Sequence, residues 1–168
     1  PVEPAGNGLI VSLVDPSGER SMCSDRGVAT ELRPEEIDEA WLTSCEHLHV
    51  SGYALLREPV RFAATRAIEH ARANGARVSV DLSSWSAIRD FGAERFRAHL
   101  EQLAPDVVFA NEAEADIVGG PIAGSAWIVK RGPRGASFDG DERPAVAVAT
   151  VVDSTGACVL APATGSLV

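Results

Sequence analysis

Short apolar runs rich in β-branched residues alternate with segments of helical periodicity, and this alternation is the strongest constraint on the fold. The predicted strands cover residues 47–51, 77–82, 106–110 and 126–130. The predicted helices cover residues 34–44, 58–74, 93–103 and 112–118. Strands that alternate with helices indicate a parallel sheet covered by helices, and therefore an α/β fold.

Segments at both ends of this pattern are also predicted to be extended. Residues 9–14 and 19–24 flank the turn signal Asp-Pro-Ser-Gly at 15–18 and are predicted to pair as a hairpin. The hairpin precedes the alternating pattern and need not belong to the main sheet. Towards the other end of the chain, residues 136–138 and 145–152 are predicted to be extended.

Composition limits the classes of function. The chain has 168 residues, of which 45% are hydrophobic and 23% charged, which suffices for one domain with a core. A net charge of −9 disfavours a nucleic-acid partner, because phosphates need a basic face. No apolar run approaches the length of a membrane span, so no membrane partner is expected. Cys23, Cys45 and Cys158 have no metal-like spacing and are interpreted as reduced thiols of a cytoplasmic protein.

Polar or glycine-rich clusters stand where the predicted strands end. These clusters are Gly52, residues 81–84, residues 111–114, residues 130–135 and residues 153–157. In parallel α/β folds, ligands bind beyond the carboxyl ends of the strands. The candidate functional residues are therefore expected in these clusters.

Asn111 and Glu114 form the first candidate pair. Asn111 ends a predicted strand, and Glu114 stands in the first turn of the helix that follows. One interpretation is a helix cap with an acid near the positive end of the helix. The other is a magnesium site, since a divalent ion that bridges phosphates is commonly held through one or two carboxylates and waters. The residues alone leave both interpretations open.

Two glycine-containing turns form the next candidates. Lys130, the only lysine of the chain, precedes Gly132 and Gly135. These glycines allow the backbone to approach a ligand closely, although a simple β-turn is the alternative. The segment from Asp153 to Ala157 follows a β-prone run and reads Asp-Ser-Thr-Gly-Ala. Its backbone N–H groups could hold an anion, although this sequence is also that of a common turn.

His47 and His49 are separated by one residue and share one face of a predicted strand. A metal-binding pair is one interpretation. The alternative is a half-buried strand with no metal, since no third ligand is evident.

The motifs, in this order, resemble the signatures of the ribokinase-like (PfkB) family of sugar and nucleoside kinases, from about Leu9 to Ala157. The resemblance implies a three-layer α/β/α parallel sheet, Rossmann-like, with a small β-hairpin lid remnant. It implies that Asn111 and Glu114 organise Mg²⁺ and phosphate. It also implies a site for ATP formed by Lys130, Gly132, Gly135, Asp153, Thr155, Gly156 and Ala157.

The chain departs from the family pattern after Ala157. The family motif continues with Gly and then with the Asp that acts as catalytic base, where this chain has Cys158 and Val159. Valine cannot accept a proton, so no catalytic residue is expected to be intact. We therefore expect a kinase fragment, shortened at both ends and inactive by itself.

The resemblance also sets the remaining expectations. It implies an ATP-dependent kinase that phosphorylates a sugar or nucleoside hydroxyl. A single domain over residues 1–168 is expected, with a lid hairpin at about 8–28, a kinase core at about 29–157 and an irregular tail at 158–168. The alternative is a non-catalytic nucleotide-binding or self-associating module that retains the fold. A homodimer could form through the edge of the hairpin.

Overall fold

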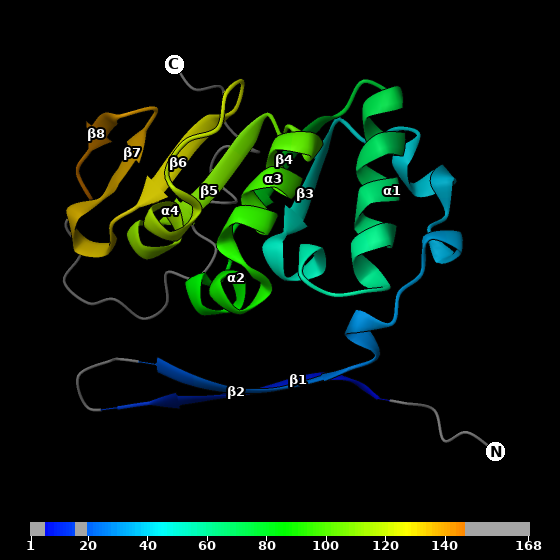
Figure 1. The fold of residues 1–168 in the computed structure, drawn as a ribbon, viewed down its shortest axis with the longest axis horizontal. Helices are drawn as coiled ribbons and strands as arrows, with labels where there is room; N and C mark the ends of the chain where they lie inside the picture. Colours follow the sequence, from blue (N-terminus) through cyan, green and yellow to red (C-terminus); the bar gives the residue numbers. More distant parts are fainter. Residues whose placement is uncertain (1–5, 16–19, 147–168) are drawn as a thin grey trace.

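The described part of the chain forms two separate sheets (Figure 1). The computed structural model describes residues 6–15 and 20–146. The first sheet is an antiparallel hairpin of β1 (Asn7–Val14) and β2 (Arg20–Gly27), in which Val11 lies opposite Cys23. The predicted hairpin is therefore confirmed, and each strand is longer than expected. It stands apart from the main sheet, as the sequence suggested.

Within the described residues the main sheet has six strands, in the order β3-β4-β5-β6-β7-β8. The parallel strands are β3 (His47–Ser51), β4 (Arg77–Asp81), β5 (Val107–Asn111) and β6 (Ala126–Lys130). These four confirm the predicted parallel core within one residue at each end. At one edge, β7 (Ala136–Phe138) and β8 (Asp141–Arg143) add in antiparallel fashion, so the whole sheet is mixed.

The helices of the described part lie on one face of this sheet (Figure 1). They are α1 (Val60–Ala73), α2 (Trp85–Phe91), α3 (Ala93–Leu103) and α4 (Glu112–Val118). Each parallel strand lies beside the previous one, and right-handed crossovers then put every connecting helix on the same side. The predicted α/β fold class is confirmed. None of the described helices is long and apolar enough to span a membrane.

A single core joins the helices to the sheet. Leu100 and Phe96 of α3 are fully buried, as are Val78 and Val80 of β4 and Val108 of β5. Alternate residues of each strand face this core because successive side chains of a strand point to opposite sides. The core therefore determines which residues of each strand face the helices.

The predicted helix at 34–44 is wrong. The segment forms two short 3₁₀ turns, Pro34–Glu36 and Glu39–Leu42. Between them Ile37 is extended, and the Asp38 carboxylate accepts a hydrogen bond from the backbone N–H of Ala40. Asp38 thus begins a second turn instead of continuing the first. Local side-chain capping overrides the helical pattern here.

Two further differences concern short elements. Helix α2 was not predicted, because its seven residues give too little periodicity to stand out. The Ser84 side chain caps it, and Gly92, at a φ of 103°, separates it from α3. Strand β8 was also not predicted. The extended stretch predicted at 145–152 is not a strand at residues 145–146, and the rest of it lies outside the described residues.

Candidate functional site

The last residues of three neighbouring strands meet at the carboxyl edge of the sheet. Asp81 ends β4, Asn111 ends β5 and Lys130 ends β6. Asn111 and Lys130 lie directly opposite each other in the β5–β6 pairing. The Lys130 ammonium lies 2.7 Å from Oδ2 of Asp81, so this ion pair reaches across the intervening strand β5. Residues 49 positions apart in sequence thereby form one polar cluster.

Asn111 and Glu114 are joined by three hydrogen bonds within this cluster. The backbone N–H of Asn111 donates to Oε2 of Glu114 at 2.8 Å, and its amide Nδ2 donates to Oε1 at 2.9 Å. In return, Oδ1 of Asn111 accepts from the backbone N–H of Glu114 at 2.9 Å. This reciprocal arrangement is a capping box at the start of α4. The helix-cap interpretation is therefore confirmed.

The Glu114 carboxyl is buried, with 4% of the residue exposed. Burial raises the pKa of this carboxyl, and the nearby Asp81 carboxylate raises it further. The hydrogen bond from the Asn111 backbone and the Lys130 ammonium act in the opposite direction on this pKa. Functional sites often contain a buried carboxyl with a raised pKa, and Glu114 is such a carboxyl in a polar cluster at the end of the strands.

The oxygen donors of this edge fit a magnesium ion. The described residues contain no group of three or more His, Cys, Asp or Glu side chains able to hold a metal ion. Mg²⁺, unlike zinc, needs few protein ligands, because it keeps several waters and binds through one or two carboxylates plus phosphate oxygens. Glu114 and Asn111 would supply such oxygens, and the capping interpretation does not exclude this use because a carboxylate has several lone-pair positions.

The turn between β6 and β7 adjoins this cluster. It contains Gly132 at a φ of 54° and Gly135 at a φ of 93°, and Arg131 N–H donates to the Gly135 carbonyl at 2.8 Å. Arg131 and Arg134 both form ion pairs with Glu112, the first residue of α4. These pairs fix the glycine turn against the start of α4, close to Asn111. The β-turn interpretation is confirmed, while a role in ligand binding stays a prediction.

The remaining residues of the predicted ATP site lie outside the described residues. They are Asp153, Thr155, Gly156 and Ala157, and Val159 at the family's base position also lies there. The structure therefore brings together Asn111, Glu114 and Lys130, with the glycine turn beside them.

His47 and His49 both hydrogen-bond to one serine on the next strand. His47 Nε2 lies 2.7 Å and His49 Nδ1 lies 2.8 Å from the Ser79 hydroxyl. Ser79 is almost completely buried, and the His49 ring meets the Phe109 ring edge to face at 5.9 Å. Strand β3 is half-buried, as the alternative interpretation has it, because Val50 is buried while His47 and His49 are exposed. The three polar side chains are hydrogen-bonded to one another on the sheet face opposite the helices.

The His49 environment predicts a loss of stability as the pH falls. Partial desolvation of the ring lowers the pKa of His49 below its usual value of 6.5; Asp81 opposes this shift, and His47 and Lys130 add to it. The residue is exposed, so solvent screens the effect and we expect a modest contribution to stability. As the pH falls below about 6.5, His49 binds a proton more readily in the unfolded chain than in the folded chain. The free energy of unfolding therefore decreases as the pH falls. We expect a His49→Gln variant to lose less stability than the parent between about pH 7.5 and 5.5 in urea titrations.

A His70→Gln variant is the matched control, because His70 lies on α1 beside Glu39, away from the sheet. It should keep more of the parent's pH dependence than His49→Gln does. If His49→Gln leaves the slope of stability against pH unchanged, the assignment of this effect to His49 is wrong.

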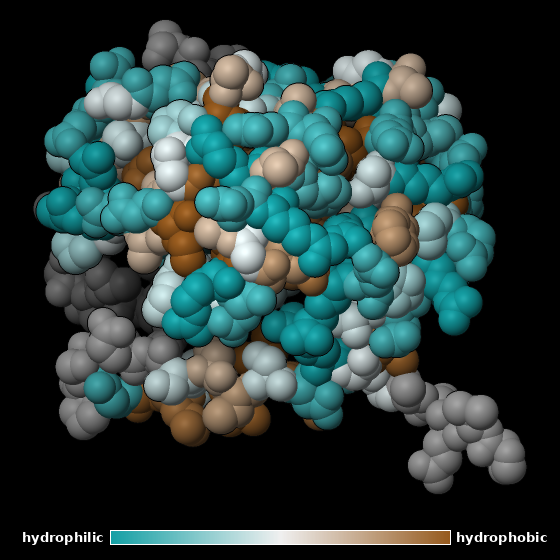
Figure 2. Space-filling model, in the orientation of Figure 1, coloured by the Kyte–Doolittle hydropathy of each residue, from teal (hydrophilic) through white to brown (hydrophobic). Residues whose placement is uncertain are grey.

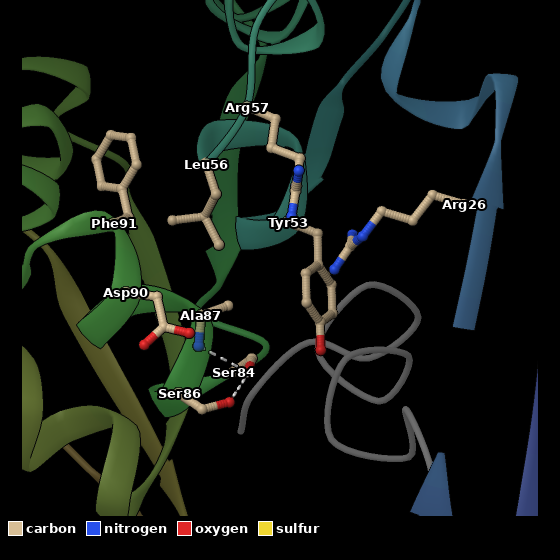
Figure 3. A pocket seen from close by; sticks show the side chains of 9 residues that line it. All are labelled: Arg26, Tyr53, Leu56, Arg57, Ser84, Ser86, Ala87, Asp90 and Phe91. Carbon is tan, nitrogen blue, oxygen red and sulfur yellow. Dashed lines mark hydrogen bonds between the residues drawn. The ribbon is translucent and has the colours of Figure 1, made fainter. Parts of the chain in front are cut away.

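Two cavities flank the same edge of the sheet and were not foreseen from the sequence. The first, of about 460 Å³, is lined by Arg26, Tyr53 and Arg57 together with residues of α2 (Figure 3). The second, of about 560 Å³, lies between the hairpin and the core and shares Arg26 and Tyr53 with the first. Sequence reasoning placed Asp81 in the strand-end cluster 81–84 but gave it no role, although its place at the end of a buried strand was a usable signal. No local sequence signal marked Arg26 or Arg57.

The family model for the pfkB family carbohydrate kinases matches residues 2–157. The chain belongs to the pfkB family. Asn111, Glu114, Lys130 and the two glycines of the β6–β7 turn therefore occupy the carboxyl edge of a pfkB-family sheet. The family resemblance seen in the sequence motifs is confirmed.

Relatives of known description agree with this membership. An ATP-dependent ribose-1-phosphate kinase of Halopiger xanaduensis is 31% identical over 144 residues, which cover 80% of this chain and 44% of the relative. The adenosine kinase of Sinorhizobium meliloti has a similar structure, with a TM-score of 0.78 and 23% identity over 89% of this chain and 50% of that one. An E. coli protein described as a ribokinase II, in complex with ATP and Mg²⁺, gives a TM-score of 0.67 and 23% identity over 83% and 51%.

The pfkB chain spans about half the length of these relatives. The similarity to the solved structures shows a shared fold, ribokinase-like and α/β. The activity and substrate of the relatives are properties of longer chains.

Proposed function

We propose that this chain is part of an ATP-dependent kinase that transfers a phosphoryl group to a hydroxyl of a sugar or nucleoside. The observation that carries the proposal is the polar cluster at the carboxyl edge of a pfkB-family sheet. In it, Asn111 and the buried Glu114 lie beside the ion pair of Lys130 and Asp81. Phosphoryl transfer depends mainly on positioning and on charge stabilisation, and this cluster supplies both polar oxygens and a cation.

Each residue of the cluster has a proposed role. Glu114 and Asn111 would hold Mg²⁺ through their oxygens and bound water, and the ion would neutralise phosphate charge. Lys130 and the turn with Gly132 and Gly135 would border the nucleotide. By family motif, Asp153, Thr155, Gly156 and Ala157 would hold the transferring phosphoryl group.

We expect no catalysis by this chain alone. Val159 stands where the family motif has its general base, and loss of a general base typically costs about 10²- to 10⁴-fold in rate. A cytoplasmic location is proposed with the kinase function.

Magnesium-dependent nucleotide binding tests the proposal. We expect calorimetry to show weak ATP binding that requires Mg²⁺. Glu114→Gln should weaken it by about 10-fold or more, since losing a carboxylate or a group that orients a metal ligand has effects of this size. Glu69→Gln, on the exposed side of α1, should leave binding unchanged. Equal affinity of the parent and Glu114→Gln for MgATP would contradict the metal role.

A self-associating module is the second candidate function, and the hairpin favours it. Leu9, Val11 and Leu13 alternate along β1 and are 69%, 58% and 56% exposed. Ile10 and Met22 line the cavity between the hairpin and the core. The side chains of Leu9, Val11 and Leu13 point to the opposite face of the hairpin, away from the core. Figure 2 shows apolar residues gathered along the hairpin at the bottom of the molecule. Such an apolar strand surface is suited to pairing with a second copy.

Light scattering after size-exclusion chromatography measures this association. We expect the parent chain to be dimeric and Val11→Glu to be monomeric, because a buried unpaired carboxylate would disfavour the interface. Ser12→Glu is the control, since Ser12 points to the opposite face of β1. A parent chain that stays monomeric at high concentration would exclude association through the hairpin.

A further inference from the structure

A cavity of about 430 Å³ in the helix layer, here called the α1–α3 cavity, is lined by residues of α1 and α3 and by the end of α2. Arg61, Arg95 and His99 supply its basic groups, and Thr65 and Gln102 supply its other polar side chains. None of the described residues that line it is Asp or Glu. The chain as a whole has a net charge of −9, so a lining of this kind stands out and is expected to attract anions.

Aromatic rings hold the two arginines of this cavity in place. The Arg95 guanidinium lies over the Phe91 ring at 4.4 Å from its centroid, and the Arg61 guanidinium lies 5.7 Å from the same centroid. Arg61 also lies over the Phe62 ring at 5.3 Å and forms an ion pair with Glu58. A guanidinium group has five N–H donors, so these contacts leave several for a ligand. Two like charges at one ring repel each other, and an anion between them would relieve this repulsion.

His99 adds a group whose hydrogen bonding is incomplete. Its Nε2 atom is enclosed and has no hydrogen-bond partner among the described residues. Buried polar atoms are nearly always paired, so an unpaired nitrogen in the wall of a cavity indicates a missing partner. Because the atom is enclosed, the ring must turn towards the cavity before a ligand oxygen can pair with it. Desolvation lowers the pKa of His99, and the charges of Arg61 and Arg95 lower it further, so the three basic groups already act on one another.

The size of the α1–α3 cavity and its donors favour a phosphate carried by a small molecule. Arg61 on one helix and Arg95 and His99 on the other offer donors to the three terminal oxygens of a phosphate monoester, one more oxygen than a carboxylate has. A volume of about 430 Å³ is in the range of small-molecule sites. A second cavity of about 200 Å³ shares His99 with it and is also lined by Glu69 and Arg72. Because the smaller cavity contains an acid, we expect the phosphate in the larger one.

The α1–α3 cavity is separate from the proposed nucleotide site. Its lining lies on the helices, whereas Asn111 and Lys130 stand at the ends of strands in the sheet. The 460 Å³ cavity that contains Arg26 shares one residue with it, Phe91. The two cavities therefore have one ring in common and different basic groups.

We propose that Arg61, Arg95 and His99 form a binding site for a small phosphate monoester between α1 and α3. This site is additional to those for the nucleotide and for the phosphoryl acceptor, and it does not depend on the kinase proposal. A bound phosphate monoester would fix both arginines, and through them the Phe91 ring. It would thereby hold in place one wall of the neighbouring 460 Å³ cavity.

Histidine NMR tests the site directly, because the chain has four histidines. We expect glycerol 3-phosphate to shift the ring signals of His99 in a saturable way. It should also raise the pKa of His99, because an anion favours the protonated ring. The signals of His70, which lies on α1 outside the lining of both helix-layer cavities, should not move. The signals of His49 report on the sheet edge near Asp81, so they reveal any binding of the same probe at the proposed nucleotide site.

Calorimetry of variants measures the contribution of the arginines. Arg95→Gln should weaken the binding of glycerol 3-phosphate by about 10-fold or more, since charge-assisted hydrogen bonds are strong. Arg95 is exposed, so this variant is expected to keep the fold, and thermal unfolding without ligand checks this. Arg66→Gln is the matched control, because Arg66 on α1 pairs with Glu39 and does not line the cavity. Succinate should bind at least about 10-fold more weakly than glycerol 3-phosphate, because its carboxylates offer fewer oxygens to each donor group.

Several outcomes would overturn the site. They are unmoved His99 signals at millimolar glycerol 3-phosphate, unchanged affinity in Arg95→Gln, or equal affinity for succinate. MgATP titrations of Arg95→Gln separate this inference from the kinase proposal. Normal MgATP binding together with weakened binding of glycerol 3-phosphate would support the separate site. Equal losses for both ligands would count against it, because Arg95 would then act through the fold.

Discussion

Phe96→Ala is expected to lower the free energy of unfolding by about 3–5 kcal/mol, the range for deleting a buried aromatic ring. Phe96 lies on α3, is fully buried and meets Phe91 of α2 edge to face at 6.4 Å between ring centroids. Its removal would leave a cavity between the helices and the sheet, because a packed core relaxes only partly. Urea unfolding followed by circular dichroism measures the loss.

Phe62→Ala is the matched control, because Phe62 on α1 is 49% exposed. It should cost clearly less than Phe96→Ala, and Phe96→Leu should fall between the two, since leucine refills part of the space. Equal destabilisation by Phe62→Ala and Phe96→Ala would show that the core is not centred on α3.

Gly52→Ala is expected to destabilise the chain by about 1–3 kcal/mol, the usual cost of overpacking. A Cβ at Gly52 would lie 2.6 Å from the Leu82 carbonyl oxygen and 2.8 Å from that of Asp81. Both neighbours are backbone atoms that cannot rotate away, so β3 and β4 must separate where they end. Because Asp81 pairs with Lys130 there, the candidate site should be disturbed together with stability.

The effect of Gly52→Ala is measured by urea unfolding and by MgATP binding on the same sample. Gly6→Ala is the control, because no atom lies within 4 Å of a Cβ built at Gly6. It should leave both quantities unchanged. A Gly52→Ala variant with the parent's stability would mean that β3 and β4 tolerate a wider separation than their packing indicates.

The sheet was predictable because its strands are short, buried and bounded by polar or glycine residues. The run at 77–81, for example, has apolar residues on the helix face and ends at Asp81. The segment at 34–44 was not predictable in the same way. Its helical pattern competes with the Asp38 side chain, and only the folded chain shows which interaction prevails.

The candidate site also has a part that was predictable from local sequence and a part that depends on the fold. Asn111, Glu114 and Lys130 were identified because strand ends are local features and their motif spacing is short. The pairing of Lys130 with Asp81 joins residues 49 positions apart and depends on the order of the strands. The cavity with Arg26 and Arg57 depends on where the hairpin docks, which no periodicity within either segment encodes.

The order of the strands in the main sheet has a consequence for how the chain forms during synthesis. From β4 to β8, each strand pairs with the one that precedes it in sequence. Among the described strands, each of these five therefore finds its neighbour already synthesised when it leaves the ribosome. Pairings between sequence neighbours need smaller loop closures, which favours fast folding. We expect the sheet to grow in one direction, from β3 outwards, as the chain lengthens.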